Sequence, residues 1–190
     1  MSECIKQMPQ VMMPQVSDQD KAKLVDTYSV GKPSEVDSKL TGKIVLEKLT
    51  DNYAKVKTSE VGYTEMKLLP LVNNTSVIAL VKTVTRPVKD GNIAFYSPDW
   101  KKIETPIIEG EPVANDFYPA DLDKNSVKGK KMSELLSVLY LNYQVKPDNN
   151  ELVITANLDT DEEDARLLKD EIDHMPAITY KWDSGRWMRK

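Results

Sequence analysis

The sequence offers few side chains for nucleophilic or acid–base chemistry. His174 is the only histidine and Cys4 the only cysteine among the 190 residues. A Ser-His-Asp or Cys-His arrangement needs a histidine beside a nucleophile, and no nucleophile motif such as Gly-x-Ser-x-Gly accompanies either residue. His174 ends a predicted helix, where an imidazolium interacts favourably with the helix dipole. We therefore expect no catalytic residues and a protein that is not an enzyme.

The acidic run Asp159 to Asp164 is the first candidate for a metal site, because hard cations prefer several carboxylate oxygens. The run lacks the glycine and glutamate spacing of a calcium-binding loop. Thr160 followed by Glu163 instead matches a helix capping box. One cysteine excludes the Cys₂His₂ and Cys₄ zinc patterns, and the scattered glycines form no nucleotide-binding motif. We expect neither a metal nor another cofactor.

The charge pattern bounds the class of partner. The net charge is −4 with both signs interspersed, so the short basic run from Lys128 to Lys131 does not predict nucleic-acid binding. No apolar run approaches the roughly 20 residues of a membrane span. A chain of 190 residues is long enough to bury one substantial core. We therefore expect a single domain over residues 1–190, no nucleic-acid partner and no transmembrane segment.

Aromatic and methionine side chains are the remaining candidates for binding. Aromatic residues at strand ends and in loops line clefts for apolar ligands, and the candidate ligand-binding residues are Phe95, Tyr96, Trp100, Trp182 and Trp187. Methionine adapts to varied surfaces, and the candidate partner-binding residues are Met8, Met12 and Met13. Packing in a hydrophobic core is the alternative use of both sets.

Strands must position most of these side chains, because β-prone runs alternate with turn residues from about residue 41 onward. Ser17 followed by Asp20 predicts the start of a helix that Gly31 ends. Asn73-Asn74 and Asp90-Gly91 predict tight turns. A second helix is predicted at 161–174, and strands are predicted at 43–49, 53–58, 63–72, 76–85, 92–96, 135–145, 152–158, 177–182 and 186–189.

Short connections between neighbouring strands favour antiparallel pairing, since parallel strands need long crossovers. We expect an α+β fold: a mostly antiparallel curved β-sheet, either a meander or a partly closed barrel, with a few packing helices. Residues 97–131 contain four prolines and predict a long surface connection. Loops of this length are uncommon unless they are functional or disordered, so this segment is a candidate binding surface.

Several stretches resemble a known family: Tyr63 to Pro70, Val77 to Val84, Phe95 to Trp100, and the closing Tyr180 to Trp187. In these residues the chain resembles an uncharacterised family of exported proteins from Bacteroidales gut bacteria, whose activity is not assigned. The resemblance implies a location in the periplasm or at the cell surface, after removal of a signal peptide that is not present in this sequence. It implies no catalytic residues.

Two functions follow as hypotheses. The leading hypothesis is a non-enzymatic exported or envelope protein that binds an apolar ligand or lipid-like group in its curved sheet. The alternative is a protein–protein interaction or structural module of the cell envelope with no small ligand. An open apolar cleft favours the first, and a filled core favours the second. A hydrolase with residues 97–131 as a lid would need titratable groups around one pocket.

Overall fold

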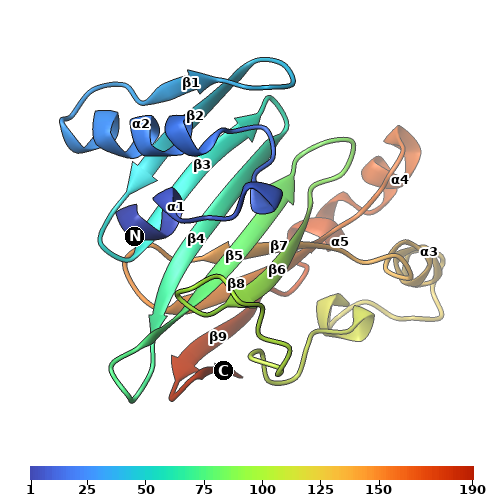
Figure 1. Ribbon diagram of the computed structural model, residues 1–190. Coiled ribbons are helices and arrows are strands. Elements are labelled where there is room, and N and C mark those ends of the chain that lie inside the picture. The colour runs from blue at the N-terminus through green and yellow to red at the C-terminus, as the bar shows by residue number, and fades with distance from the viewer.

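The computed structural model describes residues 1–190 and contains two antiparallel sheets (Figure 1). Sheet A pairs six strands in chain order: β1 (Glu35–Asp37), β2 (Lys43–Leu49), β3 (Tyr53–Ser59), β4 (Gly62–Pro70), β5 (Ser76–Val84) and β6 (Asp90–Tyr96). Sheet B has the order β10-β9-β8-β7: β7 (Tyr140–Val145), β8 (Glu151–Asn157), β9 (Ile178–Asp183) and β10 (Arg186–Arg189). The predicted α+β, antiparallel fold class is confirmed. The strands are shared between two sheets, and neither sheet closes into a barrel.

Short helices complete the fold: α1 (Ser2–Lys6), η1 (Gln10–Met12), α2 (Asp18–Ser29), η2 (Ala114–Phe117), α3 (Val127–Leu135), α4 (Glu162–Leu167) and α5 (Lys169–Asp173). The predicted cap of α2 is confirmed, because Ser17 Oγ accepts a hydrogen bond from the Asp20 amide at 3.1 Å. No helix is both long and apolar enough to cross a membrane.

The predicted helix at 161–174 differs from the structure in two respects. Asp161, and not Thr160, caps it, because α4 begins at Glu162 and the Asp161 carboxylate accepts the Asp164 amide at 2.8 Å. The helix is also divided at Leu168, which is fully buried between α4 and α5. The acidic run is therefore a helix start, as the capping interpretation of the sequence proposed.

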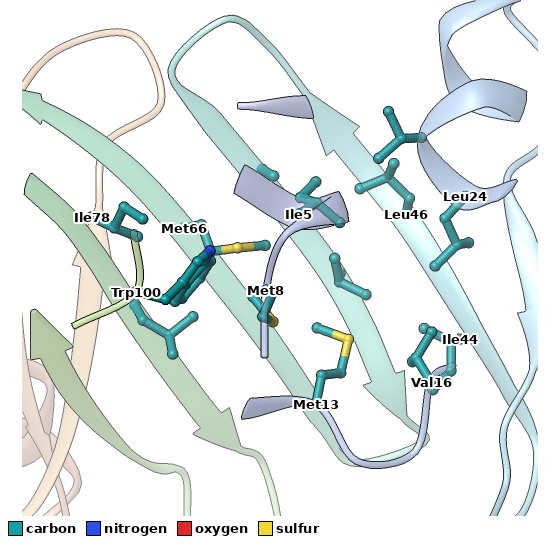
Figure 2. Packing of buried hydrophobic residues seen from close by; sticks show 14 of the residues in the cluster. Ile5, Met8, Met13, Val16, Leu24, Ile44, Leu46, Met66, Ile78 and Trp100 are labelled. Atoms are coloured by element: carbon teal, nitrogen blue, oxygen red, sulfur yellow. The ribbon is translucent and has the colours of Figure 1, made fainter. Parts of the chain in front are cut away.

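Strand β5 is buried on both faces, as its apolar sequence predicted, because every residue from Val77 to Val81 is at most 3% exposed. Sheet A consequently carries a core on each side. The helix-side core lies between sheet A, α2 and the first residues of the chain, and Figure 2 shows its packing. Its buried members are Ile5, Met8, Met13, Val16, Leu24, Val25, Val36, Ile44, Leu46, Ala54, Val56, Met66, Ile78, Leu80, Tyr96 and Trp100.

The N-terminal arm, residues 1–17, is fixed on sheet A by both packing and hydrogen bonds. The Trp100 indole N–H donates to the Cys4 carbonyl at 3.2 Å, which joins the arm to the end of β6. The Gln10 side-chain amide donates to three arm carbonyls at 2.6 to 3.2 Å, those of Met13, Pro14 and Val16. The arm therefore forms a packed layer over the sheet.

The opposite face of β4 to β6 packs against sheet B and α3, which form the inter-sheet core. Its buried members are Leu69, Ala79, Val81, Ile108, Phe117, Tyr118, Met132, Leu136, Val145, Leu152, Ile154, Leu168, Ile178, Tyr180 and Trp187. Because alternate residues of β4 and β5 enter different cores, sheet A is a layer common to both. The expectation of a single domain stays a prediction.

The predicted turn at Asp90-Gly91 is wrong, because both residues belong to β6. These residues instead position β7 where it crosses sheet A. The Asp90 carboxylate accepts the Leu141 amide at 2.9 Å. A Cβ atom on Gly91 would lie 3.1 Å from the Lys82 carbonyl and 3.4 Å from the Leu141 carbonyl. A glycine at position 91 therefore lets the two backbones approach closely. The other predicted turn is present, and Asn74 occupies it with φ of 60°.

The predicted long connection at 97–131 contains η2 and the start of α3, and it is anchored to the body of the protein. Trp100, Ile107 and Phe117 are among its buried side chains. The following strand was predicted from residue 135 but begins at Tyr140, because α3 continues to Leu135.

Replacing Gly129 of α3 by alanine is predicted to destabilise the protein, although this change usually stabilises a helix. Replacing an exposed glycine in a helix by alanine normally raises the free energy of unfolding by roughly 1 kcal/mol. At Gly129 the new Cβ would lie 2.0 Å from the Asp123 carbonyl oxygen and 2.7 Å from the Tyr118 hydroxyl. Gly129→Ala should therefore lower the free energy of unfolding by about 1–3 kcal/mol through overpacking. Urea unfolding measures this, with Lys130→Ala, at an exposed position of the same helix, as the near-neutral control.

Candidate functional site

The five aromatic candidates do not line one cleft, because sheet A separates them. Tyr96 and Trp100 belong to the helix-side core. Trp187 is buried in the inter-sheet core, and Phe95 and Trp182 pack against it, with ring centroids 5.8 and 5.5 Å from the Trp187 ring. Each of the five rings thus packs in, or against, a core filled by the protein's own side chains.

The methionine candidates do not form an exposed patch. Met8 and Met13 are 2% and 1% exposed and fill gaps between the N-terminal arm and sheet A (Figure 2). This use agrees with the flexibility of the methionine side chain, which suits irregular gaps. Met12 is half-buried and lines a surface groove described below.

A first groove runs beside β6, the outer strand of sheet A, and we call it the β6 edge groove. Its volume is about 320 Å³. One wall is the edge of β6, and the other is the segment after Trp100. The lining residues are Gly91 to Phe95, Lys102 to Ile108, Glu111, Pro112 and Tyr143.

The backbone of β6 turns unpaired groups toward this groove. Farther along the strand, the loop pairs with β6 through Ile103 N–H to Phe95 O and Ser97 N–H to Lys101 O, both at 2.9 Å. In an antiparallel sheet, alternate residues direct their N–H and C=O groups to opposite neighbours. Gly91 and Ile93 therefore direct theirs to the same side as Phe95, and no loop or turn backbone group bonds to them.

A second groove, of about 530 Å³, opens where the helix-side face of sheet A extends beyond the N-terminal arm. We call it the sheet-end groove. Its floor includes Thr64, Lys82 and Asn92, which are directly paired across β4, β5 and β6. The other lining residues are Met12, Pro14, Gln15, Ser38, Leu40, Thr41, Thr58, Ser59, Gly62, Tyr63, Thr83, Val84, Asp90 and Gly91.

Charged side chains occupy the part of sheet A that lies beside the inter-sheet core. Glu65 is 8% exposed and accepts a hydrogen bond from the Tyr53 hydroxyl. Burial raises the pKa of the Glu65 carboxyl above its ordinary value. Lys67 is fully buried and donates to the Pro147 carbonyl at 2.7 Å and the Asn52 side chain at 3.2 Å. Burial lowers the pKa of its ammonium group.

This charged cluster has a structural explanation. The Pro147 carbonyl belongs to the connection between β7 and β8, so the Lys67 ammonium ties sheet B to sheet A. The Tyr53–Glu65 pair links neighbouring strands β3 and β4. We assign these groups to the packing of the sheets, because their polar atoms face protein partners.

The surroundings of His174 do not assemble a hydrolytic site. His174 lines a hollow of about 410 Å³ with Asp121, Asp170 and Glu171, and no serine, threonine or cysteine lines it. His174 Nδ1 lies 2.5 Å from the Asp170 carbonyl oxygen of the same helical segment. Cys4 does not line this hollow. It packs against the helix-side core, and burial raises the pKa of its thiol. No group of three or more potential ligands is arranged for a metal ion.

Both grooves were missed in the sequence, although one signal was available. On β4, β5 and β6, the residues Thr64, Lys82 and Asn92 continue the same face as the apolar Met66, Leu80 and Ala94. A polar residue at the end of an apolar alternation, repeated in three successive strands, indicates that the covering layer stops there. The edge position of β6 had no comparable signal.

The geometry defines a protein of two stacked antiparallel sheets with surface grooves in place of an internal ligand cavity lined by the candidate aromatics. The chain belongs to the family of proteins of unknown function DUF3256, whose model matches residues 1–187. Among solved structures it is similar to a domain of an uncharacterized protein from Porphyromonas gingivalis W83, with 26% identity and a TM-score of 0.83. The match covers 100% of this chain and 96% of that chain. No curated protein matches the sequence.

The raised pKa of Glu65 predicts a pH effect on stability. A carboxyl whose pKa is higher in the folded state favours folding when protonated, so its contribution is lost as the pH rises through the folded pKa. Glu65→Gln keeps an acceptor for Tyr53 and removes this titration. Relative to the wild type, the variant should become more stable as the pH rises from below 4.5, the ordinary pKa of glutamate, to neutrality.

Urea unfolding at several pH values measures the Glu65 effect. Glu60→Gln is the matched control, because the Glu60 side chain is 86% exposed on the connection between β3 and β4. A stability difference for Glu65→Gln that does not change with pH would contradict the assignment.

Proposed function

We propose that this protein is a protein-interaction module that binds an extended segment of a partner polypeptide in the β6 edge groove. The observation that carries the proposal is the outward direction of the Gly91 and Ile93 backbone groups into that groove. An unpaired strand edge is a template for an additional strand, and many domains bind peptides in this way. The proposal corresponds to the interaction hypothesis drawn from the sequence.

The competing carrier hypothesis has less support. A carrier of apolar molecules needs an apolar cavity that its own side chains leave open. The aromatic residues expected to line such a cavity pack within the two cores, or against them, instead. The N-terminal arm, with Met8 and Met13, occupies the apolar face of sheet A that a lipid-like group would need.

The walls of the groove indicate which peptide fits. Side chains of an added strand alternate between the two faces of sheet A. On one face they would meet the half-buried Ile93 and Tyr143, so an apolar side chain is favoured there. In the opposite wall, Glu104 is paired with Lys102 at 3.0 Å, but Glu111 has no ion-pair partner. A peptide with apolar residues and a basic residue is therefore the expected partner segment.

We also propose that the module works in the cell envelope, in the periplasm or at the cell surface. The support is the sequence resemblance to exported Bacteroidales proteins, together with the related domain from Porphyromonas gingivalis, a member of the Bacteroidales. Fractionation of cells that produce the protein at its natural level, followed by immunoblotting, tests the location. Recovery in the cytosol alone would contradict it.

Ile93→Pro tests the peptide-binding proposal. Proline removes the outward N–H of residue 93, which β5 does not use, and proline is tolerated at such edge positions. Peptides selected from a displayed random library on the wild-type protein serve as probes. Their affinity should fall by about tenfold or more in Ile93→Pro, the equivalent of about 1.4 kcal/mol.

Ile93→Ala is the matched control, because it removes the side chain and keeps the N–H. It should retain more peptide affinity than Ile93→Pro, and the Ile93 amide of the wild type should gain protection from hydrogen exchange when peptide binds. Equal binding by the proline variant and the wild type would contradict strand addition. So would selected peptides that protect amides only outside β6.

A further inference from the structure

The sheet-end groove presents a row of polar side chains on the helix-side face of sheet A. Thr64, Lys82 and Asn92 stand side by side on three hydrogen-bonded strands, in the direct register Thr64↔Lys82↔Asn92. Directly opposite residues of an antiparallel pair have Cβ atoms about 4.5–5.5 Å apart. A hydroxyl, an ammonium and a carboxamide group are thus presented together in one row.

These polar groups have no partners within the protein. The Thr64 side chain makes no hydrogen bond, and its hydroxyl is not among the buried polar atoms that lack a partner, so it reaches the groove. Lys82 takes part in no salt bridge, and its ammonium makes no hydrogen bond. The polar atoms of this row are therefore free to bond to a ligand.

The charged residues of the groove indicate the charge of the ligand that it favours. Lys82 is the only basic side chain among its 17 lining residues, and Asp90 is the only acidic one. One carboxylate oxygen of Asp90 already accepts the Leu141 amide at 2.9 Å. The Lys82 ammonium has no partner within the protein, and it attracts an anion.

Hydroxyl groups and a thin apolar rim define the rest of the ligand. Serine and threonine hydroxyls from three segments line the groove, those of Ser38, Thr41, Thr58, Ser59 and Thr64. Leu40 and Val84, which are 78% and 48% exposed, lie at the same groove and offer C–H surface. Hydroxyl-rich molecules with C–H faces match this combination of polar floor and apolar rim.

We propose that the sheet-end groove binds a small hydroxyl-rich organic anion of the acidic-sugar type, with its anionic group on Lys82 and its hydroxyls on Thr64 and Asn92. The volume of about 530 Å³ accommodates one or two sugar rings, since ligand sites commonly measure about 300–1,000 Å³. This site lies on the helix-side face of sheet A, and it does not depend on peptide binding at the β6 edge.

Three probes separate the two parts of the proposed recognition. Glucuronate carries both the charge and the hydroxyls, glucose carries only the hydroxyls, and acetate carries only the charge. Titration of the ¹⁵N-labelled full chain should shift the backbone amides of Thr64, Lys82 and Asn92 saturably with glucuronate. Glucose and acetate should each bind at least about tenfold more weakly than glucuronate, because each loses one set of contacts.

Lys82→Met removes the ammonium and keeps a long side chain, and it should weaken glucuronate binding by about tenfold or more. Lys181→Met, at an exposed position in sheet B, is the matched control and should bind as the wild type does. Asn92→Asp, also at an exposed position, should weaken binding through repulsion, and it tests the charge even where Lys82→Met folds poorly. The proposal is overturned if glucuronate binds no more tightly than glucose and acetate, or shifts only amides outside the groove.

Discussion

The burial of β5 on both faces is the constraint on which the rest of the structure depends. A strand such as Val77 to Val81 is stable only when apolar layers cover it from two sides. The N-terminal arm and α2 supply one layer, and sheet B with α3 supplies the other. A change at β5 therefore acts on both cores, and the two layers depend on a single sheet.

Both candidate binding surfaces lie where this coverage ends. The sheet-end groove begins beyond the N-terminal arm, and the β6 edge groove begins where the strand has no neighbour within sheet A. The charged residues Glu65 and Lys67 mark a third boundary, but there the polar groups find partners in Tyr53 and in the Pro147 carbonyl. The difference between packing and binding is thus a difference in whether polar groups are satisfied.

Much of the fold was predictable from local sequence, and the failures have identifiable causes. Apolar alternation located the main strands, and Ser17 located the start of α2. Asp90-Gly91 has the chemistry of a turn but serves the crossing of β7, a contact between distant segments that local sequence does not encode. For the same reason, the division into two sheets and the edge position of β6 could not be predicted. The candidate aromatics were recognised as important side chains, but their separation by sheet A is a property of the tertiary fold.

The bond from the Trp100 indole to the Cys4 carbonyl has a consequence for biosynthesis. The two residues are 96 positions apart, so Cys4 meets its anchor only after the intervening residues have been made. At translation rates of about 5–20 residues per second, this interval lasts roughly 5–20 s. During that time Ile5 and Met8 have no completed sheet to cover them. The nascent chain thus exposes these apolar side chains, which are a natural contact for a chaperone until Trp100 emerges.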